Sequence, residues 1–489
     1  MTNFYAETDI ALDALSNNNN GLVEAATGVG KGVIIERDAV RHLIKNPSDT
    51  VVIVGHRILL VQQLMERVVK HAFDLTSTVS FKRIGIHSGG VSKIEAETLE
   101  ERIALSQYPD TMCPSIPDLE KTLTDSLNRG VGNAVYITYH SLWKVMHVCM
   151  KLGIRPRLYC DEIHTAAGDK DKWEIVEQMC QQSNSYYAFS ATVDKYRNKI
   201  EKVFGSRIYH LPADRAISLG LICQPVWMIA EVQGNRDKNL AQGVVQAFIE
   251  HGNRNTFDVN ALVNCKDTSD LKTIAGSKQV KGLYKSHPNF MLAEISSDRG
   301  CIVDGKKVDR RLWINTINGH VGPLMVLHID ICNAGINVPG FNLPIWTYLP
   351  SSETYQIQGN GRGARLSPKD RELLEQGKIS VNDRSIWDKP YNTICLLAFS
   401  DTIEEDRQEF VDFIVASRNH GFKVTDLANS SKNSGKKPDP FGGNAGQTGI
   451  TQSIQAEVDI ALENEQLREL NAQIDENDPM ACFSKFDVI

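Results

Sequence analysis

The chain has 489 residues, of which 42% are hydrophobic and 23% charged, and its net charge is −7. This balance is typical of a globular protein with about two or three domains, and it argues against a uniformly basic protein that coats nucleic acid. It does not exclude a basic groove on an acidic body.

Targeting signals and cysteine motifs give further limits. No run of about 18 apolar residues predicts a membrane span, and the N-terminus lacks the basic and apolar pattern of a signal peptide. The ten cysteines are scattered and form no C-x-x-C pair. We therefore expect a cytoplasmic protein in a reducing environment, without a membrane partner, a disulfide framework or a zinc site.

The first half of the chain alternates short apolar runs with helical patterns. A short helix is predicted over residues 3–15, and a strand at Gly21–Val23 precedes a Gly-rich loop and a second helix. Further strands are predicted at residues 51–54, 83–86, 134–137, 158–160 and 186–189. This alternation predicts a doubly wound α/β domain with functional groups at the C-terminal ends of parallel strands.

A second α/β pattern follows. Strands are predicted at residues 261–263, 290–292, 324–327, 345–348 and 394–398, with a turn and a helix near residue 305 and a final helix over 405–418. We expect the first domain to span residues 1–215 and the second 216–428. Residues 429–453, rich in Ser, Asn, Gly and Lys, predict a flexible linker. Residues 454–489 predict a C-terminal helix, packed on the body, and a tail.

The stretch Glu24–Gly32 places a Gly-rich loop with a lysine between a strand and a helix. The backbone N–H groups of such a loop and the helix N-terminus favour a bound polyphosphate, and the lysine reaches the β- and γ-phosphates. The candidate phosphate-binding residues are Thr27, Gly28, Val29, Gly30, Lys31 and Gly32. Ala25 replaces the usual first glycine, and Gly32 replaces the usual Mg²⁺-binding hydroxyl. A purely structural loop is the alternative.

Two later groups follow further strands of the predicted sheet. Asp161 and Glu162 come directly after a strand, where one carboxylate can hold Mg²⁺ and the other can orient an attacking water. A solvated surface pair is the alternative. Ser190 and Thr192 follow the next strand, and on their own they predict only a turn.

A third group lies in the second half. Arg362 and Arg365 belong to the run 358–365, which reads as a Gly-rich turn followed by a helix start. From such a position each guanidinium can bind a phosphate with two hydrogen bonds. Two solvated surface arginines are the alternative.

Taken in order, these groups resemble the motifs of superfamily II helicases of the DEAD/DEAH class, closest to phage and restriction-type DNA translocases. The matching segments are residues 25–32 (motif I), 55–63 (motif Ia), 138–142, 161–164 (motif II), 190–192 (motif III), 330–339 (motif V) and 358–365 (motif VI). Together they span most of the chain before the predicted linker.

The resemblance implies an α/β fold of two RecA-like lobes with parallel sheets, followed by a short C-terminal tail. It implies ATP and Mg²⁺ as cofactors, with Lys31 on the phosphates, Asp161 on Mg²⁺ through water and Glu162 as general base. Arg362 and Arg365 are implied as arginine fingers. The other implied residues are Gln358 in catalysis; His164, Gly335 and Asn337 near the nucleotide; and His56, Arg57, Thr138, Ser190, Thr192 and Asn333 near nucleic acid. His164 and residues 190–192 would couple the two sites.

The implied function is an ATP-dependent helicase or translocase in replication, recombination or repair, acting on DNA more than RNA. A duplex translocase for branch migration or annealing, an RNA helicase and a degenerate nucleotide-binding module are the alternatives, and Gly32 supports the last. Near Thr8 there is no clear adenine-reading glutamine, and Asn337 replaces a common aspartate. The C-terminal helix could bind a protein partner. Because the motifs precede the linker, we expect truncation near Asn429 to preserve basal ATPase activity.

Overall fold

The computed structural model describes residues 6–58, 60–61, 64–65, 68, 72, 81–86, 111–255, 257–329, 340–350, 353–419, 428–429 and 454–464. These residues divide into two compact units. The first holds the described residues up to Ile222 together with Arg365–Trp387, and the second holds the others. The division lies between residues 222 and 223, whereas a boundary at 215/216 would cut helix α10 (Ala213–Ser218).

The segment Arg365–Trp387 belongs to the first unit although it follows most of the second unit in sequence. The guanidinium of Arg384 donates a hydrogen bond to the carbonyl of Ile217 in α10, at 2.6 Å. This contact joins residues 167 positions apart. The segment contains α16 (Pro368–Glu375) and η3 (Arg384–Ile386).

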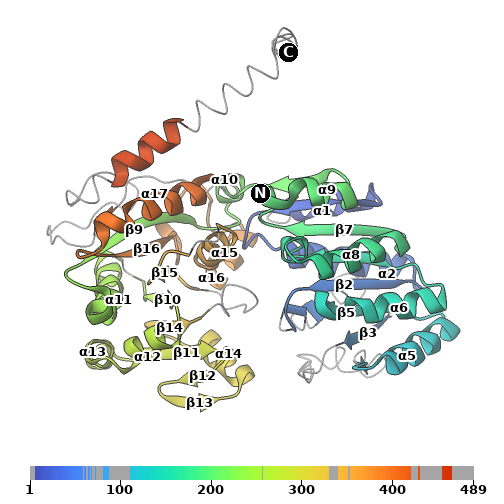
Figure 1. The fold of residues 1–489 in the computed structure, drawn as a ribbon, viewed down its shortest axis with the longest axis horizontal. Helices are drawn as coiled ribbons and strands as arrows, with labels where there is room; N and C mark the ends of the chain where they lie inside the picture. The colour runs from blue at the N-terminus through green and yellow to red at the C-terminus, as the bar shows by residue number, and fades with distance from the viewer. Residues whose placement is uncertain are drawn as a thin grey trace, which may run out of the picture. The chain divides into compact units, whose positions relative to one another are not determined.

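The first unit is built on a sheet of eight strands that pair only in parallel (Figure 1). The strands are β1 (Asn20–Ala25), β2 (Thr50–Gly55), β3 (Phe81–Ile86), β4 (Thr111–Met112), β5 (Gly132–Thr138), β6 (Arg157–Asp161), β7 (Ser185–Ser190) and β8 (Arg207–Leu211). Their order is β4-β3-β5-β2-β6-β7-β1-β8. Every residue of β2 is buried, which requires cover on both faces and explains its continuous β-branched run.

Helices connect these strands. They are α1 (Ala6–Ser16), α2 (Lys31–Lys45), α5 (Ile116–Arg129), η1 (Tyr139–Ser141), α6 (Leu142–Leu152), α7 (His164–Ala167), α8 (Lys170–Gln182), η2 (Asp194–Tyr196) and α9 (Arg197–Phe204). Side chains fix several helix starts: the hydroxyl of Ser115 accepts a hydrogen bond from the N–H of Asp118, and Asp169 accepts one from Lys172.

The second unit contains a sheet of nine strands. They are β9 (Gln224–Val232), β10 (Asn260–Asn264), β11 (Met291–Ser296), β12 (Gly300–Val303), β13 (Lys306–Val308), β14 (Leu324–His328), β15 (Leu343–Trp346), β16 (Tyr391–Phe399) and β17 (Ala428–Asn429). Their order is β13-β12-β11-β14-β10-β15-β16-β9-β17. The pairs β11–β12 and β12–β13 are antiparallel, and the other pairs are parallel.

The helices of the second unit are α11 (Arg236–Arg254), α12 (Thr268–Gly276), α13 (Lys278–Ser286), α14 (Arg310–Asn318), α15 (Glu353–Gly363) and α17 (Ile403–Asn419). Residues 454–464 are also helical and pack within this unit, where Ile454 and Val458 are fully buried beside Phe413 and Ile414 of α17. The part of the predicted C-terminal segment that the structure describes, residues 454–464, thus packs on the second unit.

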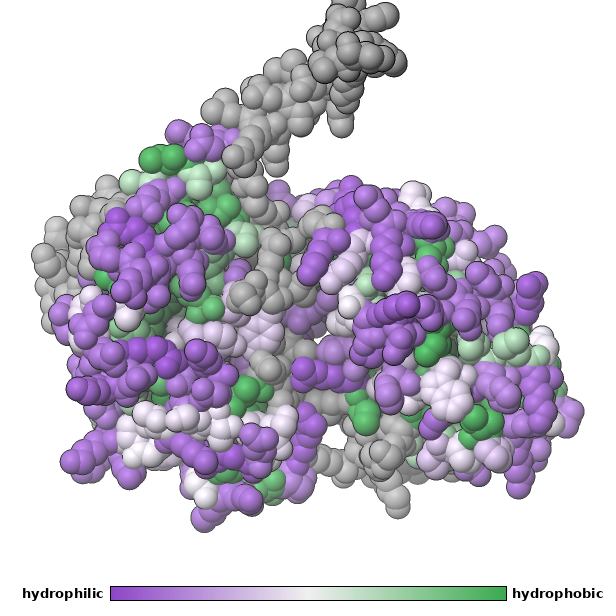
Figure 2. Space-filling model, viewed as in Figure 1, coloured by the Kyte–Doolittle hydropathy of each residue, from purple (hydrophilic) through white to green (hydrophobic). Residues whose placement is uncertain are grey.

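The surface shows the expected distribution of side chains. On the face drawn in Figure 2, hydrophilic residues predominate, and hydrophobic residues form small, scattered patches. None of the helices in the described parts of the chain combines the length and apolar character that a membrane crossing requires.

Candidate active site

The predicted functional segments of the first unit meet at one edge of its sheet. Five neighbouring strands, in the order β5-β2-β6-β7-β1, each end in one of these segments. In the same order, the segments are Thr138, Gly55 to Arg57, the pair Asp161–Glu162, Ser190–Thr192 and the loop that follows Ala25. The register confirms their closeness, since Gly55 pairs with Thr138 and Glu24 pairs with Ser190. Parallel strands bring their C-terminal ends to the same edge.

The Gly-rich loop joins β1 to α2 through two residues in left-handed backbone conformations. Gly28 has φ 93° and Gly30 has φ 97°, values that favour glycine. The carbonyl of Gly30 accepts hydrogen bonds from Val33 N–H at 2.8 Å and Ile34 N–H at 3.2 Å, which starts α2 directly behind the loop. The loop therefore has a helix N-terminus at its end, a favourable place for an anion.

Lys31 lies at the first position of α2 and is buried. Its ammonium donates a hydrogen bond to the carbonyl of Ala25 at 3.0 Å, so the side chain folds back over its own loop. Gly32, the next residue, brings no side chain to the helix start. The described loop therefore offers one cation, its backbone and the hydroxyl of Thr27 to a polyphosphate.

Behind the loop, Glu24 anchors β1 through two ion pairs. Its carboxylate accepts hydrogen bonds from Arg197 of α9 at 2.9 Å and from Arg207 of β8 at 2.8 Å. Glu24 is almost fully buried, so the pairs stabilise the residue that precedes the loop. Local sequence patterns do not reveal these partners, because they lie more than 170 positions away and carry no local motif.

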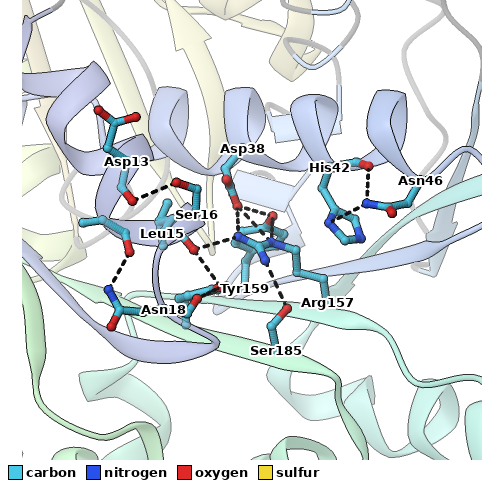
Figure 3. Close-up of polar contacts among 12 residues, drawn as sticks. Asp13, Leu15, Ser16, Asn18, Asp38, His42, Asn46, Arg157, Tyr159 and Ser185 are labelled. Carbon is cyan, nitrogen blue, oxygen red and sulfur yellow. Dashed lines mark hydrogen bonds and ion pairs between the residues drawn. The ribbon is translucent and has the colours of Figure 1, made fainter.

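A second anchor holds the middle of α2 against the first residues of β6 and β7 (Figure 3). Asp38 of α2 accepts hydrogen bonds from Arg157 at 2.7 Å and from the hydroxyl of Tyr159 at 2.6 Å. Arg157 also donates to Ser185 at 3.2 Å and to the carbonyl of Leu15 at 3.3 Å. One half-buried guanidinium thus links α1, α2, β6 and β7, and helps to fix the helix that begins at the loop.

The acidic pair ends β6 with unusual backbone geometry. Asp161 is buried, and its carboxylate accepts a hydrogen bond from the N–H of Glu162 at 3.0 Å. The carbonyl of Asp161 accepts one from the hydroxyl of Tyr139 at 2.8 Å. Glu162 has φ 50°, a left-handed conformation that costs a non-glycine residue roughly 1 kcal/mol and is concentrated at functional sites.

His164 connects this pair to the next strand. Its Nδ1 lies 2.8 Å from Ser190 Oγ and 3.5 Å from Glu162 Oε2. The hydroxyl of Ser190 donates its one proton to the carbonyl of Thr192, at 2.9 Å. Ser190 Oγ is therefore the acceptor in its contact with His164, and Nδ1 of His164 carries the proton. Burial lowers the pKa of His164, Lys31 lowers it further, and Glu162 opposes them. The imidazole is therefore neutral at physiological pH.

This geometry changes the expected role of Ser190. The residue is fully buried, and its hydroxyl already donates to Thr192 and accepts from His164. It is therefore placed to link residues rather than to touch nucleic acid itself.

His56 and Arg57 directly follow β2, and the carbonyl of Arg57 accepts a hydrogen bond from Val61 N–H at 3.2 Å.

In the second unit, the predicted Gly-rich turn is helical. Gln358 and Arg362 lie in the second half of α15, which ends at Gly363, so Arg362 is near a helix end instead of a helix start. Buried contacts offset the weak helix propensity of glycine here. Asn360 accepts a hydrogen bond from Trp346 Nε1 at 2.9 Å and donates to Ser417 Oγ at 3.1 Å.

Two further placements complete the predicted set. Arg365 follows α15 and falls in the first unit, whereas Arg362 falls in the second. Asn333, Gly335 and Asn337 lie outside the described residues.

The first unit also fits a metal-bound nucleotide. No group of three or more His, Cys, Asp or Glu side chains that could hold a metal occurs among the described residues. A single buried carboxylate, Asp161, is enough for Mg²⁺ bound mainly by phosphates and waters, because Mg²⁺ usually keeps several waters. The buried hydroxyl of Thr27, which has no hydrogen-bond partner in the described structure, adds a second polar group in the loop.

Comparison with known proteins agrees with this architecture. Residues 3–195 match the family model of the type III restriction enzyme res subunit. No curated protein shows significant sequence similarity to the chain. The residues that match the family model include the phosphate loop, the acidic pair and Ser190–Thr192.

Solved structures share the fold of both units. The ATP-dependent Type ISP restriction-modification enzyme LlaBIII, bound to DNA, superposes with a TM-score of 0.61 at 13% identity, over 86% of this chain and 30% of that one. S. cerevisiae Dbp5, as a variant bound to RNA and ADP BeF3, gives 0.53 at 9% identity, over 92% and 93%. The DUF1998 helicase MrfA bound to DNA gives 0.53 at 11% identity, over 93% and 55%. The chain thus spans less than a third of LlaBIII, and the predicted fold of two RecA-like lobes is confirmed.

Proposed function

We propose, from the premise that this chain is a superfamily II helicase-type ATPase of the DEAD/DEAH class, that it hydrolyses ATP with Mg²⁺ to move along DNA. The observation that carries the proposal is the single sheet edge where Lys31, the pair Asp161–Glu162 and the His164–Ser190 contact lie in sequence across neighbouring strands. Phosphate binding, water activation and a link between them are the parts that this reaction requires.

The residues of the first unit divide the chemistry. Lys31 would bind the β- and γ-phosphates, and Asp161 would hold Mg²⁺, an ion that would supply neutralisation of the charge on the phosphates. Glu162 accepts a proton from the attacking water while the oxygen of that water bonds to the γ-phosphorus. The bond from that phosphorus to the β–γ bridging oxygen breaks, and ADP and phosphate result. Arg362 and Arg365 stabilise the charge on the transferring group, assisted by Gln358.

The neighbouring strands supply the nucleic-acid side. Thr138 and the residues His56 and Arg57 lie beside the acidic pair along the same edge, where they can bind the phosphate backbone of a strand. His164 joins the acidic pair to Ser190, so a change at the nucleotide phosphates can reach the segment that ends at Thr192. We infer that this contact couples hydrolysis to movement.

DNA is the favoured substrate because the matched family is that of restriction enzyme res subunits, and two similar structures are bound to DNA. The likeness to RNA-bound Dbp5 keeps an RNA substrate as the competing outcome. Steady-state ATPase rates with single-stranded DNA, forked DNA, duplex DNA and single-stranded RNA separate the two. We expect DNA to stimulate most, and a duplex as the best activator would identify a duplex translocase.

One observation favours a second function. Gly32 removes the hydroxyl that usually ligates Mg²⁺, as expected of a nucleotide-binding module that does not turn over. Such a module would bind nucleotide and show no hydrolysis with any of the four nucleic acids. Hydrolysis stimulated by one of them excludes it.

A further inference from the structure

A group of exposed lysines lies on two elements of the second unit. Lys278, Lys281 and Lys285 belong to α13, and Lys306 and Lys307 belong to β13, the edge strand of the nine-stranded sheet (Figure 1). All five are exposed, and none forms an ion pair with a residue that the structure describes. Because the chain as a whole has a net charge of −7, a group of positive charges on one unit is a distinct feature.

A fixed turn presents the two lysines of β13. Asp304 and Gly305 join β12 to β13 with φ 46° and 78°, the left-handed values of a two-residue hairpin turn. The carboxylate of Asp304 accepts a hydrogen bond from Leu292 N–H at 3.0 Å, and its own N–H donates to the carbonyl of Leu292 at 2.9 Å. The turn is therefore held against the start of β11, and the two lysines follow it directly.

The same aspartate joins the hairpin to α13. Asp304 also accepts a hydrogen bond from the hydroxyl of Tyr284 at 2.7 Å. Tyr284 lies between Lys281 and Lys285 in sequence, and at 3.6 residues per turn all three lysines of α13 share a face of about 120° with it. The lysines of α13 thus lie beside the residue that contacts the turn. We call the five lysines on α13 and β13 the lysine face.

Acidic groups near the lysine face bind other partners. Asp304 accepts the hydrogen bonds from Leu292 and Tyr284. Asp309 caps α14 by accepting one from Leu312 N–H at 2.9 Å, and Glu294 pairs with Arg299 at 3.0 Å. These acids hold the local structure together, so the charge of the lysine face is left for a ligand.

The location of the lysine face separates it from the ends of the parallel strands. Its turn contacts Leu292, the second residue of β11, and so lies at the N-terminal end of that strand. Lysines on an edge strand also discourage pairing with another chain, which accounts for Lys306 and Lys307. It does not account for three further lysines on a helix.

We propose that the lysine face is a secondary binding surface for the phosphate backbone of nucleic acid. The inference rests on the proposed function, because nucleic acid is the polyanion that such a motor must hold while it moves. Ammonium groups contact phosphates as point charges and carry no base information, so this binding is independent of sequence. Since the contact lies away from the hydrolysis step, it strengthens the hold on nucleic acid without changing basal turnover.

The test removes two charges at a time from the full chain. One variant carries Lys281→Gln and Lys285→Gln, and the other carries Lys306→Gln and Lys307→Gln. Fluorescence anisotropy measures their affinity for two labelled DNA duplexes of unrelated sequence over a range of salt concentrations. We expect each variant to bind both duplexes about fivefold or more weakly near about 0.1 M salt, and the slope of log affinity against log salt to fall by about 1–2. ATP hydrolysis without nucleic acid should match wild type.

Two controls accompany these variants. Arginine at the same positions keeps the charge and should bind within about twofold of wild type. A variant with Lys121→Gln and Lys202→Gln removes two charges from exposed lysines of the first unit, and it should also stay within about twofold. An equal loss in this last variant would show that net charge alone weakens binding, and would overturn the assignment.

The remaining outcomes separate this inference from the proposed function. Unchanged affinity and salt slope in both glutamine variants, with nucleic-acid-stimulated hydrolysis in wild type, refute the lysine face alone and favour an acidic protein as its partner. Wild type that binds DNA but never hydrolyses ATP refutes the proposed function. In that case the loss of DNA binding in the glutamine variants still supports the lysine face.

Discussion

At the residue scale, the site contains one residue with an unfavourable backbone angle and one with a buried hydroxyl that no described residue satisfies. Glu162 adopts φ 50°, and Thr27 buries a hydroxyl without a partner in the described structure. Both features cost stability, and both lie at the sheet edge that carries Lys31. A strained backbone at a residue such as Glu162 is concentrated at functional sites.

A buried histidine in the second unit gives a stability prediction. Burial lowers the pKa of His328 to about 3, with a further lowering by the nearby Arg362. The folded-state pKa is below the ordinary value of 6.5, so the contribution to stability is complete above that value and declines as the pH falls toward 3. At pH 5, the loss amounts to about 2 kcal/mol.

The test measures how much the free energy of unfolding falls from pH 7 to pH 5. His328→Leu should lose about 2 kcal/mol less than wild type over this interval, because an apolar side chain has no proton to bind. Urea denaturation at both pH values measures the difference. His147→Gln, which alters an exposed histidine, is the control and should follow wild type. Identical pH dependence in His328→Leu and wild type would show that His328 titrates normally.

At the element scale, α15 is held by buried polar contacts at several points. Asn360 joins the helix to Trp346 of β15 and Ser417 of α17, and the ammonium of Lys389 donates to the carbonyl of Gly363 at 2.5 Å. Lys389 is almost fully buried, and a cation at a helix C-terminus is favourable. These contacts fix the part of α15 that presents Arg362.

The role proposed for Arg362 predicts a specific loss. Arg362→Ala should lower the turnover number for ATP by about 10³-fold or more, since an arginine on the transferring phosphoryl group contributes that much. Arg362→Lys should recover little, because an ammonium lacks the planar pair of donors. The measurement is steady-state hydrolysis with saturating DNA, with circular dichroism to confirm the fold. Arg310→Ala, on the exposed start of α14, is the control. Normal turnover in Arg362→Ala would remove it from the mechanism.

The C-terminal helix belongs to the core of the second unit. Ile454 and Val458 are fully buried in the cluster that also contains Trp346 and Phe413, and Arg407 of α17 pairs with Glu457 at 3.2 Å. The same cluster supports Tyr355 of α15. Truncation near Asn429 would therefore expose part of this core, so we now expect it to destabilise the second unit even though every motif precedes it.

Two substitutions in one helix test this packing. Val458→Ala should lower the free energy of unfolding by about 1–3 kcal/mol, through lost burial and a small cavity. Ile460→Ala should change it by less than about 0.5 kcal/mol, because that side chain is 58% exposed. Chemical denaturation of the full chain measures both. Equal, small effects at the two positions would mean that the helix contributes little to the unit.

The sequence predicts most of the buried strands of both sheets, and it misses β4, β8, β9, β17 and the β12–β13 hairpin. Buried parallel strands such as β2 and β5 show continuous apolar runs, and these were identified. The edge strand β8 alternates exposed and buried residues, with Arg207 and His210 exposed, so it has no such run. The β12–β13 hairpin is short and was expected as a turn, although α14 follows it as predicted.

Some features of the candidate site can likewise be predicted from the sequence, and others cannot. Residues that follow a predicted strand, such as Lys31, Asp161 and Ser190, could be placed from local patterns because parallel strands end together. Contacts between distant segments could not. The ion pairs of Glu24 with α9 and β8, and the anchoring of Asn360 to α17, depend on tertiary packing.

At the scale of the whole molecule, the proposed function requires two α/β units to act as one ATP-dependent motor. The first unit carries the phosphate loop, the acidic pair and the backbone-binding candidates, and the second carries Arg362. The chain passes between the units more than once, since Arg365–Trp387 returns to the first. Under the proposal, both units are needed for turnover, and nucleic acid must raise it.

Turnover of ATP by wild type and Glu162→Gln, each with and without saturating single-stranded DNA, tests this claim most directly. Wild type should hydrolyse ATP faster with DNA. Glu162→Gln should bind ATP with wild-type affinity and lose turnover by about 10²-fold or more, because an amide cannot accept the proton of the attacking water. Equal turnover in the two proteins, or wild-type hydrolysis that single-stranded DNA leaves unchanged, would contradict the account.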